Sequence, residues 1–310
     1  MPTLGPLTML DRSSARRHDA EWMLAKAADP ATRYLMLIER RIAIVADEAR
    51  TTATLRHFSH RDIVAFGLAD HPTSFLGLDA EGHAYFALDI TEHRARVVPG
   101  GPFVLKPYVD LRSLALAGQL GRDELSLAGI ARALAEWHRT HRCCGHCGSQ
   151  TDIKDGGWRR KCWSCGQEHF PRTDPVVIML VTNGDDCLIA REPRFEGTMH
   201  STLAGFLEPG ETIEATVRRE VKEEVGLTIG EVTYQESQPW PFPHSLMIGC
   251  RAEALDRELT LDPKEIAEAR WVGRDELRSM LEGRHPEGII VPGRHAIAYK
   301  LLTAFVEGAR

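Results

Sequence analysis

The 310-residue chain has no long hydrophobic run, and none of its apolar segments approaches the ~20 residues that a membrane helix needs. Its first residues, MPTLGPLTMLDRSSARR, are interrupted by Asp11 and Arg12 and lack the apolar core of a signal peptide. We therefore expect a cytoplasmic protein. Internal repeats and low-complexity tracts are also not visible. An apolar share of 43% and a charged share of 26% are typical of a soluble globular protein of two or three domains.

The sequence also lacks an excess of positive charge, since its formal net charge is −6. Binding to the phosphate backbone of nucleic acid through a broad basic surface is therefore not expected. An anionic substrate would need a bound cation or local arginines in order to approach such a chain.

The hydrophobic pattern predicts a mixed domain that gives way to a long helix, then to a compact cysteine module, then to an α/β sandwich. Residues 73–90 should form two strands around a turn at Glu81-Gly82, and residues 122–141 should form a helix that Ser126 or Asp123 caps. Further strands are expected at 174–181, 187–191, 202–205, 228–238, 245–254 and 269–272, and helices at 274–283 and 294–307. The predicted domains are 1–140, 141–170 and 171–310.

Four of the seven cysteines form two C-x2-C pairs, which fourteen residues separate. Two such knuckles can place four thiolates at the corners of a tetrahedron, which suits Zn²⁺; the four are Cys144, Cys147, Cys162 and Cys165. Cys143 could replace a ligand, and His146 and His169 are weaker candidates. Because all four ligands would be cysteines, we expect one structural zinc per chain. Cys187 and Cys250 are expected in the core.

The stretch GFLEPGETIEATVRREVKEEVG, residues 205–226, crowds acidic side chains together. It predicts a loop and then a helix that Thr212 caps and Gly226 ends, with valines at 217, 221 and 225 facing the core. Glu220, Glu223 and Glu224 would share a neighbouring face. Three carboxylates there cannot all stay ionised without compensation, and oxygen ligands in such number suit Mg²⁺ or Mn²⁺.

The alternative for this helix is a solvated acidic face, balanced by Arg218, Arg219 and Lys222, and charge pattern alone favours it. Either arginine could also hold a neighbouring carboxylate in place. The glycines and their spacing shift the balance towards a metal site, and both interpretations stay open at this point.

This stretch resembles the Nudix box, G-x5-E-x7-R-E-U-x-E-E-x-G-U with U aliphatic, and it meets every fixed position. Those positions are Gly205, Glu211, Arg219, Glu220, Val221, Glu223, Glu224, Gly226 and Leu227. The resemblance implies an α/β/α sandwich that hydrolyses nucleoside diphosphates linked to another moiety. It also implies that Glu220, Glu223 and Glu224 bind the divalent cations, and that Glu211 and Arg219 form a supporting ion pair.

A second stretch, SQPWPFPHSLM at 237–247, bears on the substrate. Its prolines hold the chain extended, and Trp240 and Phe242 offer flat faces that suit a purine or pyridine ring. A proline-braced loop with its aromatic side chains in the core is the alternative. The stretch closely resembles the SQPWPFPxS signature of NADH pyrophosphatases within the Nudix superfamily. The resemblance implies substrate contacts from Gln238, Pro239, Trp240, Pro241, Phe242, Pro243, His244 and Ser245.

The same resemblance implies further site residues outside these two stretches. It adds Glu265 and the Ala204 carbonyl to the metal ligands, with Glu268 as a rival for Glu265. It places Phe206 and Phe170 around the nicotinamide, although both could be plain core residues. It assigns a backbone contact to Ile297-Ala298. An acidic residue that some relatives carry just before Trp158 is missing here.

Taken together, the sequence predicts a hydrolase that cleaves the pyrophosphate of NADH or NAD⁺ into nicotinamide mononucleotide and AMP. The same bond occurs in NAD-capped RNA, whose caps the resembled family removes. A Nudix hydrolase that prefers ADP-ribose or dinucleoside polyphosphates is the first alternative, and a catalytically silent zinc-ribbon RNA-binding module is the second. The resemblance also implies a homodimer.

Overall fold

The computed structural model describes residues 10–47, 49, 51–71, 73–96, 107–195 and 197–308. The chain divides into two compact units. One comprises the residues up to Arg172 together with Pro241–His244, and the other comprises Thr173–Trp240 and the residues from Ser245 onward. Among the described residues, no helix is long and apolar enough to cross a membrane.

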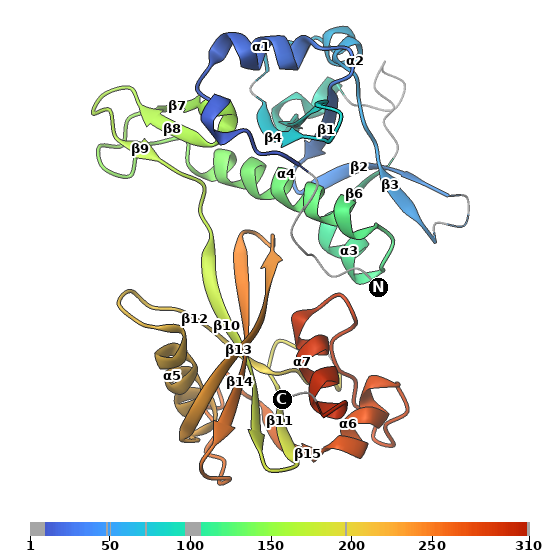
Figure 1. Ribbon diagram of the computed structural model, residues 1–310, viewed down its shortest axis with the longest axis vertical. Coiled ribbons are helices and arrows are strands. Elements are labelled where there is room, and N and C mark those ends of the chain that lie inside the picture. Colours follow the sequence, from blue (N-terminus) through green and yellow to red (C-terminus); the bar gives the residue numbers. More distant parts are fainter. Residues whose placement is uncertain are drawn as a thin grey trace. The chain divides into compact units, whose positions relative to one another are not determined.

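The N-terminal unit is built on a six-stranded mixed sheet (Figure 1). Its strands are β1 (Arg33–Ile38), β2 (Arg41–Ala46), β3 (Ala53–Leu55), β4 (Ser74–Leu78), β5 (Ala84–Asp89) and β6 (Tyr108–Asp110). The order is β3-β2-β1-β5-β4, with β6 on β2, and β1 runs parallel to β5. The paired strands β4 and β5 confirm the predicted hairpin. Its helices are α1 (Ala20–Ala28), α2 (His60–Ala65), α3 (Leu111–Leu116) and α4 (Arg122–Thr140).

Helix α4 confirms the predicted long helix, but its cap differs from the prediction. Gly121 is the N-cap, and no side chain caps the helix. Asp123 lies in the first turn, where its charge complements the helix dipole, and Ser126 lies inside the helix. The apolar face of α4 is buried, including Leu127, Ala131, Leu134 and Trp137.

The cysteine module is a three-stranded antiparallel sheet in the order β7-β8-β9. Its strands are β7 (Thr151–Lys154), β8 (Arg159–Cys162) and β9 (Glu168–His169). The first C-x2-C knuckle precedes β7, and the second begins at Cys162, the last residue of β8. The antiparallel pairing of these strands therefore brings the knuckles to the same end.

The C-terminal unit is a mixed sheet between helices (Figure 1). Its strands are β10 (Asp174–Asn183), β11 (Asp186–Arg191), β12 (Leu203–Phe206), β13 (Ile229–Trp240), β14 (Ser245–Ala254) and β15 (Glu268–Gly273). The order is β13-β14-β10-β11-β15, with β12 on β10, and only β10 and β14 pair in parallel. Its helices are α5 (Ile213–Val225), α6 (Arg274–Leu281) and α7 (Ile297–Val306).

Strand β10 shows why this unit has three layers. Val177, Met179 and Val181 point into the cluster that contains the valines of α5. Ile178 and Leu180 point into the opposite cluster, with α6 and α7. Because side chains alternate along a strand, one apolar run supplies both faces of the sheet. The predicted α/β/α sandwich with a mixed sheet is therefore confirmed, and Cys187 and Cys250 lie in its core.

Candidate active site and zinc site

Helix α5 carries the acidic residues of the predicted site, and its ends form as the sequence predicts. The side chain of Thr212 accepts a hydrogen bond from the N–H of Ala215 at 3.2 Å, and Gly226 ends the helix with a left-handed φ of 79°. The valines at 217, 221 and 225 are fully buried. This burial fixes the rotation of the helix and hence the directions in which its glutamates point.

Arg219 is the centre of the polar network on α5. Its Nε and Nη2 donate to the two carboxylate oxygens of Glu211 at 2.7 and 2.9 Å, a bidentate pair. Its Nη1 lies 2.9 Å from an oxygen of Glu220 and from one of Glu223. The bonds from Arg219 lower the pKa of Glu211 to about 2. The geometry predicted for the Glu211–Arg219 pair is therefore present.

Arg218, the other candidate for holding a carboxylate, does not do so. Its guanidinium donates to the backbone carbonyls of Glu214 and Gly230 at 3.2 and 2.7 Å. It therefore ties α5 to the start of β13.

Glu220 and Glu224 are buried, with 9% and 6% of their surfaces exposed. Burial, followed by the charges of Glu220 and Glu265, raises the pKa of Glu224 to about 8, and burial also raises the pKa of Glu220. Only Glu223 keeps more than half of its side chain exposed. The alternative of a solvated acidic face is therefore wrong for two of the three glutamates.

One carboxylate oxygen of Glu224 lacks a hydrogen-bond donor in the described part of the chain, and a bound cation would compensate its charge. Its Oε2 is buried, and no hydrogen-bond partner for it occurs among the described residues. A buried carboxylate oxygen without a donor is costly unless it is protonated or binds a cation. The donor set therefore fits a hard divalent cation such as Mg²⁺ or Mn²⁺.

Gly205 gives Glu220 the space that it occupies. It lies on β12, which pairs with β10, and a Cβ at this position would lie 1.9 Å from Cδ of Glu220. Any other residue would displace the carboxylate. Ala204, whose carbonyl is a predicted ligand, precedes this glycine on β12.

Two acidic residues outside α5 influence the same carboxylates. Glu265 is exposed in the turn that follows Asp262, and its charge raises the pKa values of Glu220 and Glu224. Glu192, which directly follows β11, also raises the pKa of Glu224. Glu192 was not predicted from the sequence, where its position directly after the apolar run CLIAR was the only signal.

The carboxylates form a looser group than the four cysteine sulfurs do. Mg²⁺ usually keeps several waters and is bound directly through only one or two carboxylates, so not every carboxylate of the set need contact it. Glu268, the rival of Glu265, lies 3.7 Å from both Arg191 and His200. It is engaged with these residues at the edge of β15.

Gln238, a predicted substrate contact, is 3% exposed. Its Nε2 donates to the carbonyl of His295 at 2.8 Å, and its Oε1 accepts the N–H of Ile297 at 2.8 Å. These bonds hold the start of α7 against β13. Ala298 is the second residue of α7 and its side chain is buried in the core, so a substrate could reach it only through its backbone.

The other residues of the proline-rich stretch lie at the end of the β13–β14 hairpin. Pro239 and Pro243 are exposed, Pro241 is buried, and Trp240, Phe242, His244 and Ser245 are half-buried. Trp240 ends β13 and Ser245 begins β14. The aromatic side chains are thus not plain core residues.

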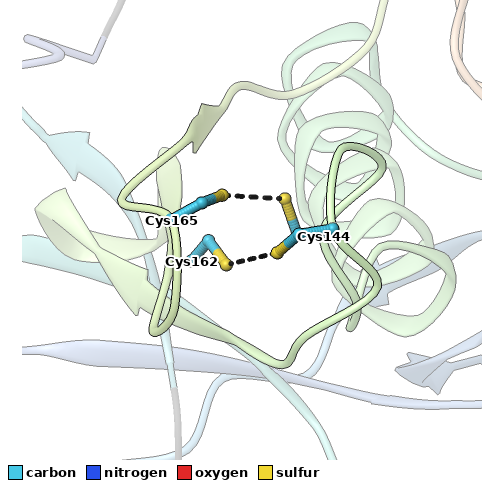
Figure 2. Close-up of side chains that lie close together, drawn as sticks. Cys144, Cys162 and Cys165 are labelled. Atoms are coloured by element: carbon cyan, nitrogen blue, oxygen red, sulfur yellow. Dashed lines mark hydrogen bonds between the residues drawn. The ribbon is translucent and has the colours of Figure 1, made fainter.

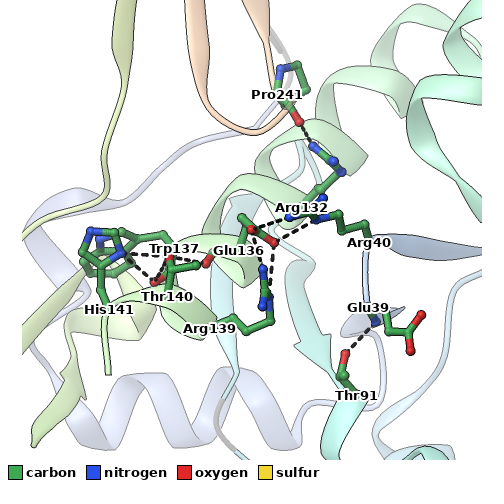
Figure 3. Close-up of polar contacts among 10 residues, drawn as sticks. All are labelled: Glu39, Arg40, Thr91, Arg132, Glu136, Trp137, Arg139, Thr140, His141 and Pro241. Carbon is green, nitrogen blue, oxygen red and sulfur yellow. Dashed lines mark hydrogen bonds and ion pairs between the residues drawn. The ribbon is translucent and has the colours of Figure 1, made fainter. Parts of the chain in front are cut away.

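Pro241–His244 belong to the N-terminal unit, where α4 holds them (Figure 3). Arg132, which is 7% exposed, donates to the Pro241 carbonyl, and its guanidinium lies over the Phe242 ring at 4.9 Å. One face of Phe242 is therefore already covered. One turn along α4, Glu136 binds Arg40 and Arg139 at 3.2 and 2.6 Å.

The two predicted nicotinamide contacts, Phe170 and Phe206, are 63% and 58% exposed. The alternative that they are core residues is therefore wrong. Large exposed aromatic side chains are free to stack on a ligand ring.

The four predicted zinc ligands come together (Figure 2). The sulfurs of Cys144 and Cys165 lie 3.7 Å apart and those of Cys147 and Cys162 lie 3.4 Å apart, and all four lie within 4.8 Å of one another. Zn–S bonds of about 2.3 Å in a tetrahedron place sulfurs roughly 3.8 Å apart, so the group fits Zn²⁺. Cys143 is exposed and outside the group, and His169 lies 3.3 Å from the Cys144 sulfur as a neighbour.

Comparison with protein families gives three matches along the chain. Residues 23–137 match the NADH pyrophosphatase-like rudimentary NUDIX domain, residues 139–170 match the NADH pyrophosphatase zinc ribbon domain, and residues 172–291 match the NUDIX domain. The second match contains the four clustered cysteines, and the third contains α5.

Curated relatives span most of the chain. The NAD-capped RNA hydrolase NUDT12 of Homo sapiens is 33% identical over an alignment 338 residues long, which covers 96% of this chain and 72% of that protein. The NAD-capped RNA hydrolase NudC of Stutzerimonas stutzeri is 43% identical over 188 residues, covering 61% and 64%. A solved NUDIX hydrolase from Nitrosomonas europaea aligns with 54% of this chain and 90% of its own at 21% identity and a TM-score of 0.41.

Proposed function

Because the chain belongs to the Nudix hydrolase family, in its zinc-ribbon NADH pyrophosphatase branch, we propose that it hydrolyses the pyrophosphate bond of NADH and NAD⁺. The products are nicotinamide mononucleotide and AMP. The same cleavage removes NAD caps from RNA 5′ ends, the activity for which its relatives are named. The observation that carries the proposal is the buried pair Glu220 and Glu224: Glu220 contacts Arg219, and Oε2 of Glu224 has no hydrogen-bond partner among the described residues.

We propose Glu220, Glu223, Glu224, Glu265 and the Ala204 carbonyl as the residues that hold Mg²⁺ or Mn²⁺. The bound cation would neutralise the phosphate oxygens and lower the pKa of the attacking water. Arg219 holds the carboxylates of Glu220 and Glu223 in place and is itself held by Glu211. A carboxylate of this set accepts the proton of the water. Gly205 keeps Glu220 where it can act.

For substrate recognition we propose the exposed rings of Phe170 and Phe206 and the half-buried ring of Trp240. Gln238 acts as a positioning residue, because its amide holds the backbone at the start of α7. His244, Ser245 and the prolines of the hairpin shape the surface around Trp240. Phe242 contributes through its contact with Arg132.

The zinc ribbon is structural in this proposal, with one Zn²⁺ held by its four cysteines. We further propose the domain boundaries 1–140, 141–170 and 171–310, a homodimer and a cytoplasmic location. A chain with a net charge of −6 suits a dinucleotide better than a long stretch of RNA backbone.

Competition among substrates tests the choice of substrate. The protein is incubated with Mg²⁺ or Mn²⁺ and equimolar NADH, NAD⁺, ADP-ribose and diadenosine tetraphosphate, and each is followed by chromatography. We expect preferential loss of NADH or NAD⁺. Trp240→Ala should raise KM for NADH about 10-fold while changing KM for ADP-ribose little, since ADP-ribose has no nicotinamide ring.

Preference for ADP-ribose or the tetraphosphate would retain the metal chemistry and refute the substrate. Equal effects of Trp240→Ala on both KM values would remove ring recognition from this residue. No turnover with either cation would favour the silent RNA-binding module.

A further inference from the structure

The N-terminal unit contains a cavity of about 760 Å³ that the proposed function does not use. Its walls come from the segment after α2, the end of β5 with the following 3₁₀ helix (Thr91–Arg96), the end of α4 and the zinc ribbon. The volume is in the range of small-ligand sites, ~300–1,000 Å³. None of the carboxylates around α5 lines it.

One of the side chains that line this cavity is a buried arginine. Arg160 is 6% exposed, and its guanidinium binds the Thr151 hydroxyl at 2.7 Å, the Thr151 carbonyl at 2.9 Å and Nδ1 of His138 at 3.1 Å. Among the described residues, no acidic side chain forms an ion pair with it. A buried charge is stable only when it is compensated. Asp70, Asp89 and Glu92 also line the cavity, and the charge of Asp152 acts on Arg160, so an anion is favoured only at the wall that Arg160 forms.

A second arginine stands beside the first. Arg142 lines the same cavity as Arg160, and its charge lowers the pKa of Arg160. The Thr151 hydroxyl, which accepts from Arg160, donates to the backbone carbonyl of Arg142 at 3.0 Å. The side chain of Arg142 forms an ion pair with Glu92, and both are more than half exposed, at 58% and 63%. An exposed pair contributes little stability, so the guanidinium can exchange Glu92 for a phosphate, which it binds through two parallel hydrogen bonds.

Flat rings line another part of the cavity wall. The imidazoles of His71 and His93 lie 4.8 Å apart, centroid to centroid, in an edge-to-face arrangement. Aromatic faces of this kind stack on nucleobases with little regard to sequence. Gln150 and Asp89 add hydrogen-bonding groups to the same cavity.

We propose that this cavity binds a mononucleotide, with its phosphate against Arg142 and Arg160 and its base against the His71–His93 pair. The ligand is bound there and not cleaved. The segment that begins at Gly118 and runs through α4 repeats part of the spacing of the Nudix box. The matching residues are Gly118, Glu124, Arg132, Leu134 and Glu136. Ala133 and Trp137 occupy the positions that correspond to Glu220 and Glu224 of α5. The cavity thus lies between a NUDIX-type domain that lacks two of these carboxylates and the zinc ribbon, and it is independent of the proposed hydrolysis.

Calorimetric titration of the full zinc-loaded chain with AMP, without added Mg²⁺ or Mn²⁺, tests the proposal. We expect one site, weakened at least 10-fold by Arg142→Ala. Arg16→Ala is the matched control, because Arg16 is equally exposed at 57% and also pairs with an acid, Asp19. Adenosine should bind at least 10-fold more weakly than AMP, since it lacks the phosphate.

Arg160→Gln should also weaken AMP binding at least 10-fold. The zinc content and the circular dichroism of this variant verify that it folds. Should it not fold, Arg142→Ala alone still tests the proposal. Glu220→Gln should bind AMP as the unmodified chain does. The proposal is overturned if millimolar AMP does not bind, if adenosine binds as tightly as AMP, or if Glu220→Gln abolishes binding while Arg142→Ala leaves it intact. Hydrolysis of NADH is assayed separately, so failure of either proposal is recognised by itself.

Discussion

Gly205 has a structural reason for its place in the motif, because it leaves room for the carboxylate of Glu220. The sequence predicts a glycine six residues before Glu211, and the structure supplies the reason: the carboxylate of Glu220 fills the space where a Cβ would lie. The glutamates of α5 could be predicted because their spacing fixes the helix face. Glu192 and the contacts of Gln238 could not, because they depend on which strands and helices become neighbours.

Gly205→Ala should lower kcat about 100-fold while the protein still folds, because a catalytic group displaced by about 1 Å loses roughly that factor. Gly273→Ala is the control, since its Cβ would approach no atom closer than 3.5 Å and its φ is ordinary. Steady-state kinetics and circular dichroism of both variants provide the measurement. Full activity of Gly205→Ala would contradict the role given to Glu220.

His138 predicts how stability changes with pH. Burial, followed by the charge of Arg160, lowers its pKa to about 4, below the ~6.5 of an unfolded histidine. As the pH falls, the unfolded chain is protonated first, so the stability that His138 contributes is complete above about pH 6.5 and is lost progressively toward about pH 4.

The variant His138→Asn keeps an acceptor for Arg160 but does not titrate. We expect the difference in unfolding free energy between the unmodified chain and this variant to fall with decreasing pH, by at most ~1.4 kcal/mol per unit. Urea unfolding at pH 5 and pH 7.5 measures it. A difference that is the same at both values would refute the assignment.

Among the elements, apolar runs and cap residues were the most informative parts of the sequence. The run DPVVIMLV predicted a buried strand, and Thr212 and Gly226 predicted both ends of α5. Errors lay at the ends of elements: helix 294–307 begins only at Ile297, and the cap of α4 is Gly121. Cap and end positions are held by tertiary contacts, such as that of Gln238 with Ile297, which local propensity does not contain.

The zinc ribbon has a direct test in its cysteines. Cys162→Ser should remove zinc and lower the melting temperature, because a closed four-sulfur site supplies much of the folding energy of so small a module. Cys143→Ser should keep both, since Cys143 is exposed and outside the group of four sulfurs. Zinc content by elemental analysis and thermal denaturation distinguish the variants. Equal zinc in both would disprove the ligand set.

Across the whole molecule, the family matches correct one expectation. The sequence showed no internal repeat, yet two regions match NUDIX-type domains. The repetition is not visible in the sequence because several fixed positions of the Nudix box differ around α4. Among them, Ala133 and Trp137 occupy positions at which the box has glutamate. Trp137 is 1% exposed and packs in the core, so the position that corresponds to Glu224 of α5 stabilises the fold on α4.

The central claim is that the carboxylates of α5 support hydrolysis of the NAD pyrophosphate. The most direct measurement is a time course of NAD⁺ with Mn²⁺, in which the products of the unmodified chain and of Glu220→Gln are separated by chromatography. We expect nicotinamide mononucleotide and AMP in equal amounts, and a rate at least 100-fold lower in the folded variant. Release of nicotinamide and ADP-ribose, or full activity in Glu220→Gln, would contradict the account.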